Sequence, residues 1–162
     1  CSIGRYKQLR FGFPHTHLQT MARIKIDLPE SFTFSTEIPI YIGHINYGHH
    51  LDNAQLISLV SEARVRYFKS MGYSELDVEG VGIVVADVAA QYRSEAFHGE
   101  TLRVDMTAND FNKYGCDLVW RLSDQASGRE VARGKHGIIF FDYTARKATS
   151  VPPAFVAKAQ QA

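Results

Sequence analysis

Residues 44–64 read HINYGHHLDNAQLISLVSEAR, and this stretch decides the fold. It begins as a loop rich in His, Gly and Asn, and it changes at Asp52 to a helical period without an intervening Pro. Asp52 is a favourable N-cap residue, and Gln55 three positions later completes a capping-box pattern. The apolar residues that follow share one helical face: Leu56, Leu59, Val60, Ala63 and Tyr67. We predict a helix of about five turns that ends near Met71, with Gly72 at the C′ position.

An alternating pattern before the loop predicts the first strand. Apolar or β-branched residues occupy every second position: Phe32, Phe34, Thr36, Ile38 and Ile40. Pro39 cannot donate a backbone hydrogen bond, so this end of the strand is expected at an edge of the sheet.

Four more strands are predicted after the helix. They cover residues 81–92, 101–108, 116–123 and 130–142, with short turns between them. The first of these, VGIVVADVAAQY, is apolar on both faces, which favours a central place in the sheet. Gly134 and Gly137 are expected to mark a bulge or close packing. Residues 154–161 are consistent with a short terminal helix.

The order of strand, long helix and four-strand meander predicts an α+β domain. Short connections favour antiparallel pairing. The simplest packing is a curved five-stranded antiparallel sheet wrapped around one long central helix. Pairing of two copies would cover the exposed sheet edges, so we expect a homodimer or a dimer of dimers.

Length and composition indicate one ordinary globular domain. The chain has 162 residues, of which 45% are apolar and 22% are charged. We assign residues 21–162 to a single domain, because Met21-Ala22-Arg23 reads like a natural start. Residues 1–20 are then an N-terminal extension or a cloning artefact.

Several classes of protein are not supported by the sequence. The net charge is +1 and no basic block occurs, which argues against a nucleic-acid partner. No apolar run reaches the roughly 18 residues of a membrane span, and the N-terminus lacks the apolar core of a signal peptide. We therefore expect a cytoplasmic protein that does not bind membranes.

Cysteine and histidine positions do not predict a disulfide framework or a metal site. Two cysteines, Cys1 and Cys116, are too few for such a framework, and we expect Cys116 to be a buried free thiol. His49 and His50 are adjacent, and neighbouring side chains on an extended backbone point to opposite sides. We therefore expect no metal.

The loop and the helix together resemble the hotdog-fold acyl-CoA thioesterases of the 4-hydroxybenzoyl-CoA thioesterase type. In that family a loop of the form Asp-x-x-Gly-His-Val-Asn-Asn precedes a long helix with an acidic-Ala-Arg motif. The matching text here is NYGHHLDN at 46–53 and Glu62-Ala63-Arg64. The segment YRSEAFHGE at 92–100 is similar to the family's hairpin. The resemblance covers about residues 30–145.

This resemblance implies a hotdog fold, thioester hydrolysis and an active site between two subunits. It implies no cofactor, with coenzyme A present as part of the substrate. Three positions depart from the family pattern. Asn46 stands where the family has its catalytic Asp, His49 stands where it has Gly, and Asp52 replaces the first Asn. Asn46 cannot act as a carboxylate base, so that duty must have moved or been replaced by the positioning of water.

Candidate catalytic residues lie around the start of the helix. Free backbone N–H groups near Asp52 and Asn53 could stabilise an oxyanion. Asn46 is a candidate holder of water or of the carbonyl, or it braces the loop. His50 either positions the loop or polarises the carbonyl. The base is Asp52 or Glu62.

Each of these carboxylates has a structural alternative. In the alternative for Asp52, this residue serves only as the cap of the helix. In the alternative for Glu62, this residue forms an exposed ion pair with Arg66 at i+4.

Further residues are candidates for substrate binding. Tyr47 and Gly48 are expected to shape the loop. Asp87, within an apolar strand, either pairs with a helix residue such as Arg64 or faces the pocket. Arg93 and Lys113, and also Arg121, could contact CoA phosphates or remain ordinary surface charges.

Two rivals to hydrolysis remain open. One is a non-catalytic module that binds acyl-CoA or an acyl carrier, which the Asn at position 46 makes credible. The other is a hotdog hydratase or dehydratase.

Overall fold

The computed structural model describes residues 23–161. The elements follow one another as β1 (Phe34–Pro39), the 3-10 helix η1 (Ile42–His44), α1 (Asn53–Ser70), β2 (Gly82–Tyr92), β3 (Thr101–Asn109), β4 (Gly115–Asp124), β5 (Glu130–Asp142), β6 (Lys147–Ala148) and α2 (Pro153–Ala159). The predicted extension at 1–20 lies outside the described residues, so that boundary stays a prediction.

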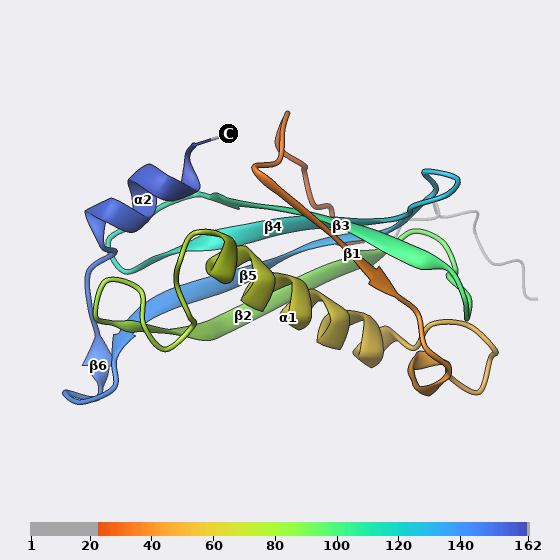
Figure 1. The fold of residues 1–162 in the computed structure, drawn as a ribbon, viewed down its shortest axis with the longest axis horizontal. Coiled ribbons are helices and arrows are strands. Elements are labelled where there is room, and N and C mark those ends of the chain that lie inside the picture. Colours follow the sequence, from red (N-terminus) through yellow and green to blue (C-terminus); the bar gives the residue numbers. More distant parts are fainter. Residues whose placement is uncertain (1–22, 162) are drawn as a thin grey trace, which may run out of the picture.

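The strands form one antiparallel sheet in the order β1-β3-β4-β5-β2. Figure 1 shows α1 lying across one face of this curved sheet. The predicted α+β class and the sheet around a long helix are therefore confirmed. The sheet differs from the prediction by a sixth strand, because β6 returns after a turn and pairs with the end of β5 for two residues.

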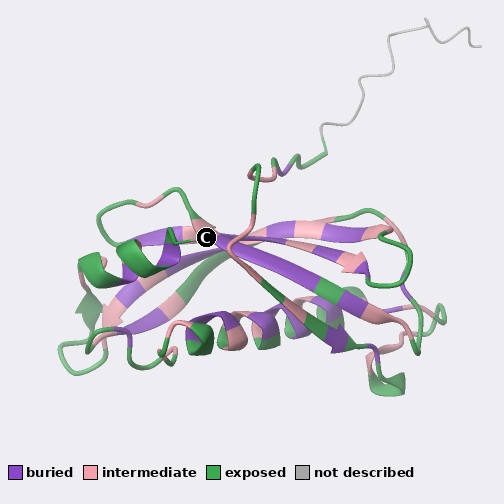
Figure 2. Cartoon of the chain, turned by 45° about the horizontal axis from the view of Figure 1, so that its top comes forward, coloured by how far each residue is buried: buried purple, intermediate pink, exposed green. Residues whose placement is uncertain are grey.

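The boundaries of α1 follow from local chemistry. Asp52 is the N-cap, and its carboxylate accepts hydrogen bonds from the N–H groups of Ala54 and Gln55. Met71 is the C-cap, and Gly72 takes a left-handed φ of 83°, which glycine adopts without steric cost. The helix buries one stripe against the sheet, made of Leu56, Leu59, Val60, Ala63, Tyr67 and Phe68. Figure 2 shows this buried face turned toward the strands.

The position of β2 corrects the prediction of a central strand. β2 lies at the edge of the sheet and pairs only with β5 among the described residues. Val85 and Val88, near its middle, are 41% and 46% exposed. The two-sided apolar pattern that favoured a central place therefore belongs to a strand whose outer edge a single chain leaves uncovered.

Trp120 of β4 is fully buried in the core of the domain. Gly134, opposite Trp120 in the register of β4 and β5, leaves room for the indole, because a Cβ at this position would overlap the ring. A Cβ at Gly137 would likewise overlap the carboxylate of Asp87. Both glycines are the close-packing points that the sequence predicted. The register of the sheet shifts at two other places, between Val85 and Asp87 of β2 and between Leu122 and Ser123 of β4.

The predicted terminal helix exists as α2 and covers one end of the core. Phe155 of α2 is fully buried and stacks on Phe68 of α1, with ring centroids 5.7 Å apart. Its ring also lies 5.1 Å from that of Phe140 on β5. Cys116 is buried as a free thiol, as predicted, and burial raises its pKa to about 12.

No helix in the described part of the chain is long and apolar enough to cross a bilayer.

Candidate active site

The loop before α1 is held in shape by Asn46. Its Oδ1 atom accepts a hydrogen bond from the N–H of Gly48 at 2.9 Å and a longer one from the N–H of His50 at 3.5 Å. The backbone of Asn46 also pairs with the backbone carbonyl of His50. The loop-bracing alternative for Asn46 is therefore present in the structure.

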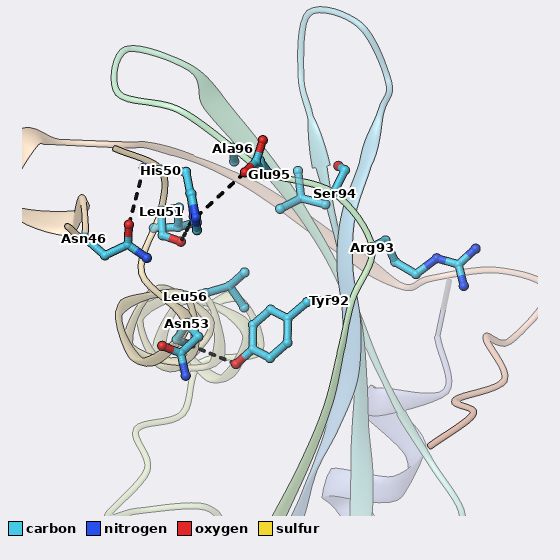
Figure 3. A pocket seen from close by; sticks show the side chains of 11 residues that line it. Asn46, His50, Leu51, Asn53, Leu56, Tyr92, Arg93, Ser94, Glu95 and Ala96 are labelled. Atoms are coloured by element: carbon cyan, nitrogen blue, oxygen red, sulfur yellow. Dashed lines mark hydrogen bonds and ion pairs between the residues drawn. The ribbon is translucent and has the colours of Figure 1, made fainter. Parts of the chain in front are cut away.

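These contacts also fix the orientation of the Asn46 amide. Two backbone N–H groups face one side-chain atom, so that atom must be the oxygen. The Nδ2 group is then turned away from the loop, toward the side where Asn53 lies (Figure 3). The part of Asn46 that is available to a ligand is therefore a hydrogen-bond donor and not an acceptor.

The loop keeps the backbone shape that a glycine would allow at position 49. His49 has a φ of 66°, in the left-handed region that favours glycine. Its side chain is exposed. The substitution of His for the family's Gly therefore leaves a left-handed backbone, at a conformational cost of about 1 kcal/mol.

The amino end of α1 offers fewer free donors than the sequence suggested. The Asp52 carboxylate takes the N–H of Ala54 at 2.8 Å and that of Gln55 at 3.1 Å. The N–H of Leu56 already bonds to the Asp52 carbonyl. The N–H of Asn53 has no hydrogen-bond partner within residues 23–161. This single amide therefore remains for a ligand at the positive end of the helix.

A pocket of about 380 Å³ opens beside this helix end. It lies between the loop and first turn of α1 on one side and the chain after β2 on the other (Figure 3). Its apolar lining consists of Leu51, Leu56, Ala96 and Val131. Its polar lining consists of Asn46, His50, Asn53, Tyr92, Arg93, Ser94 and Glu95.

His50 is held at the wall of this pocket. Its Nδ1 lies 3.2 Å from the Leu51 carbonyl oxygen, which makes Nδ1 the protonated donor nitrogen. Its Nε2 lies 3.8 Å from an oxygen of Glu95 (Figure 3). Gly48 leaves room for this ring, since a Cβ at position 48 would stand 3.0 Å from Nε2.

Tyr92 connects the end of β2 to the start of α1. Its hydroxyl donates to the Asn53 carbonyl at 3.0 Å. Burial, and then the charge of Asp52, raise the pKa of this phenol. Tyr92 therefore stays a neutral donor at physiological pH and joins the two walls of the pocket.

Several predicted site residues lie elsewhere in the single chain. Glu62 is on the outer side of α1 and forms an ion pair with Arg66 at 2.7 Å, so the surface alternative describes it. Asp87 is exposed on β2 and does not line the pocket. Arg64 pairs with Glu75 and not with Asp87. Tyr47 is fully exposed at the loop tip.

The proposed phosphate-binding cations are also dispersed. Lys113 stacks on Tyr114 in the turn between β3 and β4, and its carbonyl bonds to Val151. Arg121 pairs with Asp105, which is buried, at 2.8 Å. Arg93 lines the pocket, but its guanidinium points away from the other labelled residues (Figure 3).

Arg64 of the helical motif has a structural role. Its Nε atom lies 2.5 Å from an oxygen of Glu75, and its Nη1 atom lies 3.3 Å from Nδ1 of His136. His136 is a buried residue of β5. Burial and the nearby guanidinium lower the pKa of His136 to about 4.

Glu95 and Tyr92 line the pocket but are not among the site residues predicted from the sequence. Both belong to the segment 92–100, whose resemblance to the family's hairpin gives no role to either side chain. The available signal for Glu95 is its place two residues after Arg93, the basic residue of the pattern, in the same segment as Tyr92. Within the described residues, no group of three or more His, Cys, Asp or Glu could hold a metal ion.

A family model described as thioesterase-like superfamily matches residues 40–159, which include this loop, the helix and all of the strands after it. The chain belongs to the thioesterase-like superfamily. No curated protein matches the sequence at a significant level.

Solved structures share the fold of this thioesterase-like chain. The 1,4-dihydroxy-2-naphthoyl-CoA thioesterase from Synechocystis has a TM-score of 0.71 at 16% identity, covering 78% of this chain and 94% of its own. A Thermus thermophilus thioesterase complexed with coenzyme A and Zn has a TM-score of 0.69 at 16% identity, covering 81% and 100%. A Staphylococcus aureus protein in complex with CoA has a TM-score of 0.70 at 16% identity, covering 83% and 85%. The predicted hotdog architecture is thereby confirmed.

Proposed function

We propose that this thioesterase-like protein hydrolyses an acyl-CoA thioester to a free carboxylic acid and free CoA. The observation that carries the proposal is the pair of donors at the pocket, the Asn53 N–H and the Asn46 side-chain amide. A donor aimed at a developing oxyanion contributes roughly 3–4 kcal/mol to catalysis. The positive end of α1 adds to this stabilisation.

The reaction needs water and no covalent enzyme intermediate. The oxygen of water attacks the carbonyl carbon, and the carbonyl oxygen takes up negative charge between the two donors. The carbon–sulfur bond then breaks, the thiol leaves with a proton, and the acid is released. The Asp52 carboxylate is engaged with Ala54 and Gln55, so capping is its role in this proposal.

The apolar residues that line the pocket favour a substrate whose acyl group is uncharged. Leu51, Leu56, Ala96 and Val131 provide apolar contacts, and a volume of about 380 Å³ lies within the range of small-molecule sites. The solved relatives that hold CoA support the coenzyme as the thiol part. Arg93, at the rim, is the cation in the lining that could meet a phosphate.

The proposal includes a homodimer that pairs along β2. The exposed apolar residues Val85 and Val88 lie on the open edge of this strand. Tyr92 ends the same strand and lines the pocket, so a partner on this edge would approach the site. A dimer of dimers remains a further expectation, as does a cytoplasmic location.

Release of thiol separates hydrolysis from binding alone. DTNB assays with short aliphatic, long aliphatic and aromatic acyl-CoA esters should detect free CoA with at least one ester. The rival is a binding module, which Asn46 in place of a carboxylate favours. If no ester is cleaved while esters raise the melting temperature, the binding module is the correct function.

A further inference from the structure

The pocket needs a group that accepts a proton from water, and Asn46, Asp52 and Glu62 do not supply one. Asn46 presents a donor, because its oxygen is engaged with Gly48. The Asp52 carboxylate caps α1, and Glu62 forms a surface pair with Arg66. Hydrolysis at neutral pH needs such an acceptor for efficient attack by water.

Among the residues that line the pocket, one carboxylate and one imidazole are present. These are Glu95 and His50, and they come from opposite walls. Nε2 of His50 and an oxygen of Glu95 are 3.8 Å apart. At this separation the carboxylate attracts a positive imidazolium, and a water molecule can contact both groups.

We propose that His50 is the general base of the site and that Glu95 is a positioning residue that favours the protonated ring. This inference rests on the hydrolysis proposed above. The Leu51 carbonyl holds the proton on Nδ1, so Nε2 carries the lone pair and faces the pocket wall. Nε2 is thus the nitrogen that accepts the proton, and Nδ1 is the nitrogen through which the Leu51 carbonyl orients the ring.

The proton is conserved through the reaction. Nε2 removes one proton from water as the carbon–oxygen bond forms. The tetrahedral intermediate then breaks its carbon–sulfur bond, and the imidazolium returns that proton to the departing sulfur. The site ends in its starting state, with acid and thiol as the products.

Other charged groups near His50 are accounted for. Asp52 is two residues away, but its carboxylate bonds to backbone amides of α1. Arg93 lines the same pocket with its guanidinium pointing away (Figure 3). Glu95 is therefore the charged side chain that the structure pairs with His50. Glu95 is 65% exposed, so its effect on His50 is a modest one.

Two substitutions test the pair. His50→Asn keeps an N–H near the Nδ1 position for the Leu51 carbonyl but removes Nε2. It should lower kcat/KM by about 10²–10³-fold. Glu95→Gln should lower kcat by about three- to tenfold and leave KM within about twofold, since the imidazolium that forms during the reaction loses its partner.

Glu37→Gln is the matched control, because Glu37 is an exposed carboxylate on β1, distant from the pocket. It should keep the wild-type kcat and KM. Thermal melting of each variant checks that the fold is retained. An active wild type with an unchanged His50→Asn rate, an unchanged Glu95→Gln kcat, or a larger loss in Glu95→Gln than in His50→Asn overturns the pair alone. A wild type that releases no thiol from any ester overturns the hydrolysis itself.

Discussion

His136 connects the stability of the fold to pH through one buried side chain. Its Nδ1 accepts a hydrogen bond from Arg64 at 3.3 Å, so the ring is neutral in the folded protein. Burial, and then the Arg64 charge, lower its pKa from 6.5 to about 4. The unfolded chain therefore binds more protons than the folded chain between these two values.

The free energy of unfolding should fall as pH drops through this window. The contribution of His136 is complete above about pH 6.5, and most of it, about 2–3 kcal/mol, is lost by pH 4.5. His136→Gln retains an acceptor for Arg64 without titrating in this range, so its stability should fall by correspondingly less. Urea unfolding of both proteins at pH 7 and 4.5 measures the difference. Equal pH dependence in the two proteins would contradict this role.

The residues of the candidate site could be predicted by type but not by orientation. The loop motif directed attention to Asn46, His50 and Asn53, which all line the pocket. The sequence could not reveal that Asn46 turns its oxygen into the loop, because this depends on the backbone amide of Gly48. Glu95 was missed because its relation to His50 exists only once β2 brings the following segment beside α1.

At the scale of elements, α1 depends on its cap. The Asp52 carboxylate satisfies two of the amides that the first turn leaves unpaired. Asp52→Ala should lower the free energy of unfolding by about 1 kcal/mol, within a range of roughly 0.5–2.

Asp52→Asn should retain the cap and most of the activity. Asn caps helices about as well as Asp, so stability should stay within about 0.5 kcal/mol of the wild type. Thiol release should also stay within about threefold, because the capping carboxylate is not the base in our proposal. Denaturant unfolding and ester hydrolysis measure both effects. A large loss of rate with unchanged stability would return the base to Asp52.

Most elements could be predicted because their signals are local. The capping residue and Gly72 fix α1, and alternation or apolar runs between turns fix the strands. The place of β2 in the sheet could not be predicted in this way. A strand with an apolar pattern is expected to be covered on both faces. The pattern does not indicate whether the covering residues belong to the same chain or to a second copy.

At the scale of the whole molecule, the β2 edge is where a second copy is expected. Val88→Lys places a charge on this edge and should shift the protein from dimer to monomer in size-exclusion chromatography with light scattering. Ile24→Lys is the control, since Ile24 is 61% exposed in the segment before β1. That variant should stay dimeric. A monomeric wild type, or a dimeric Val88→Lys, would contradict pairing along β2.

The central claim is that the pocket stabilises an oxyanion through donors at the amino end of α1. Asn46→Asp tests it most directly, because the aspartate retains the oxygen that braces the loop but replaces the donor with a negative acceptor. Thiol release from the best acyl-CoA ester should fall by about 10²–10³-fold in kcat, as for loss of an oxyanion donor. An Asn46→Asp protein that hydrolyses the ester as fast as the wild type, or faster, would contradict the account.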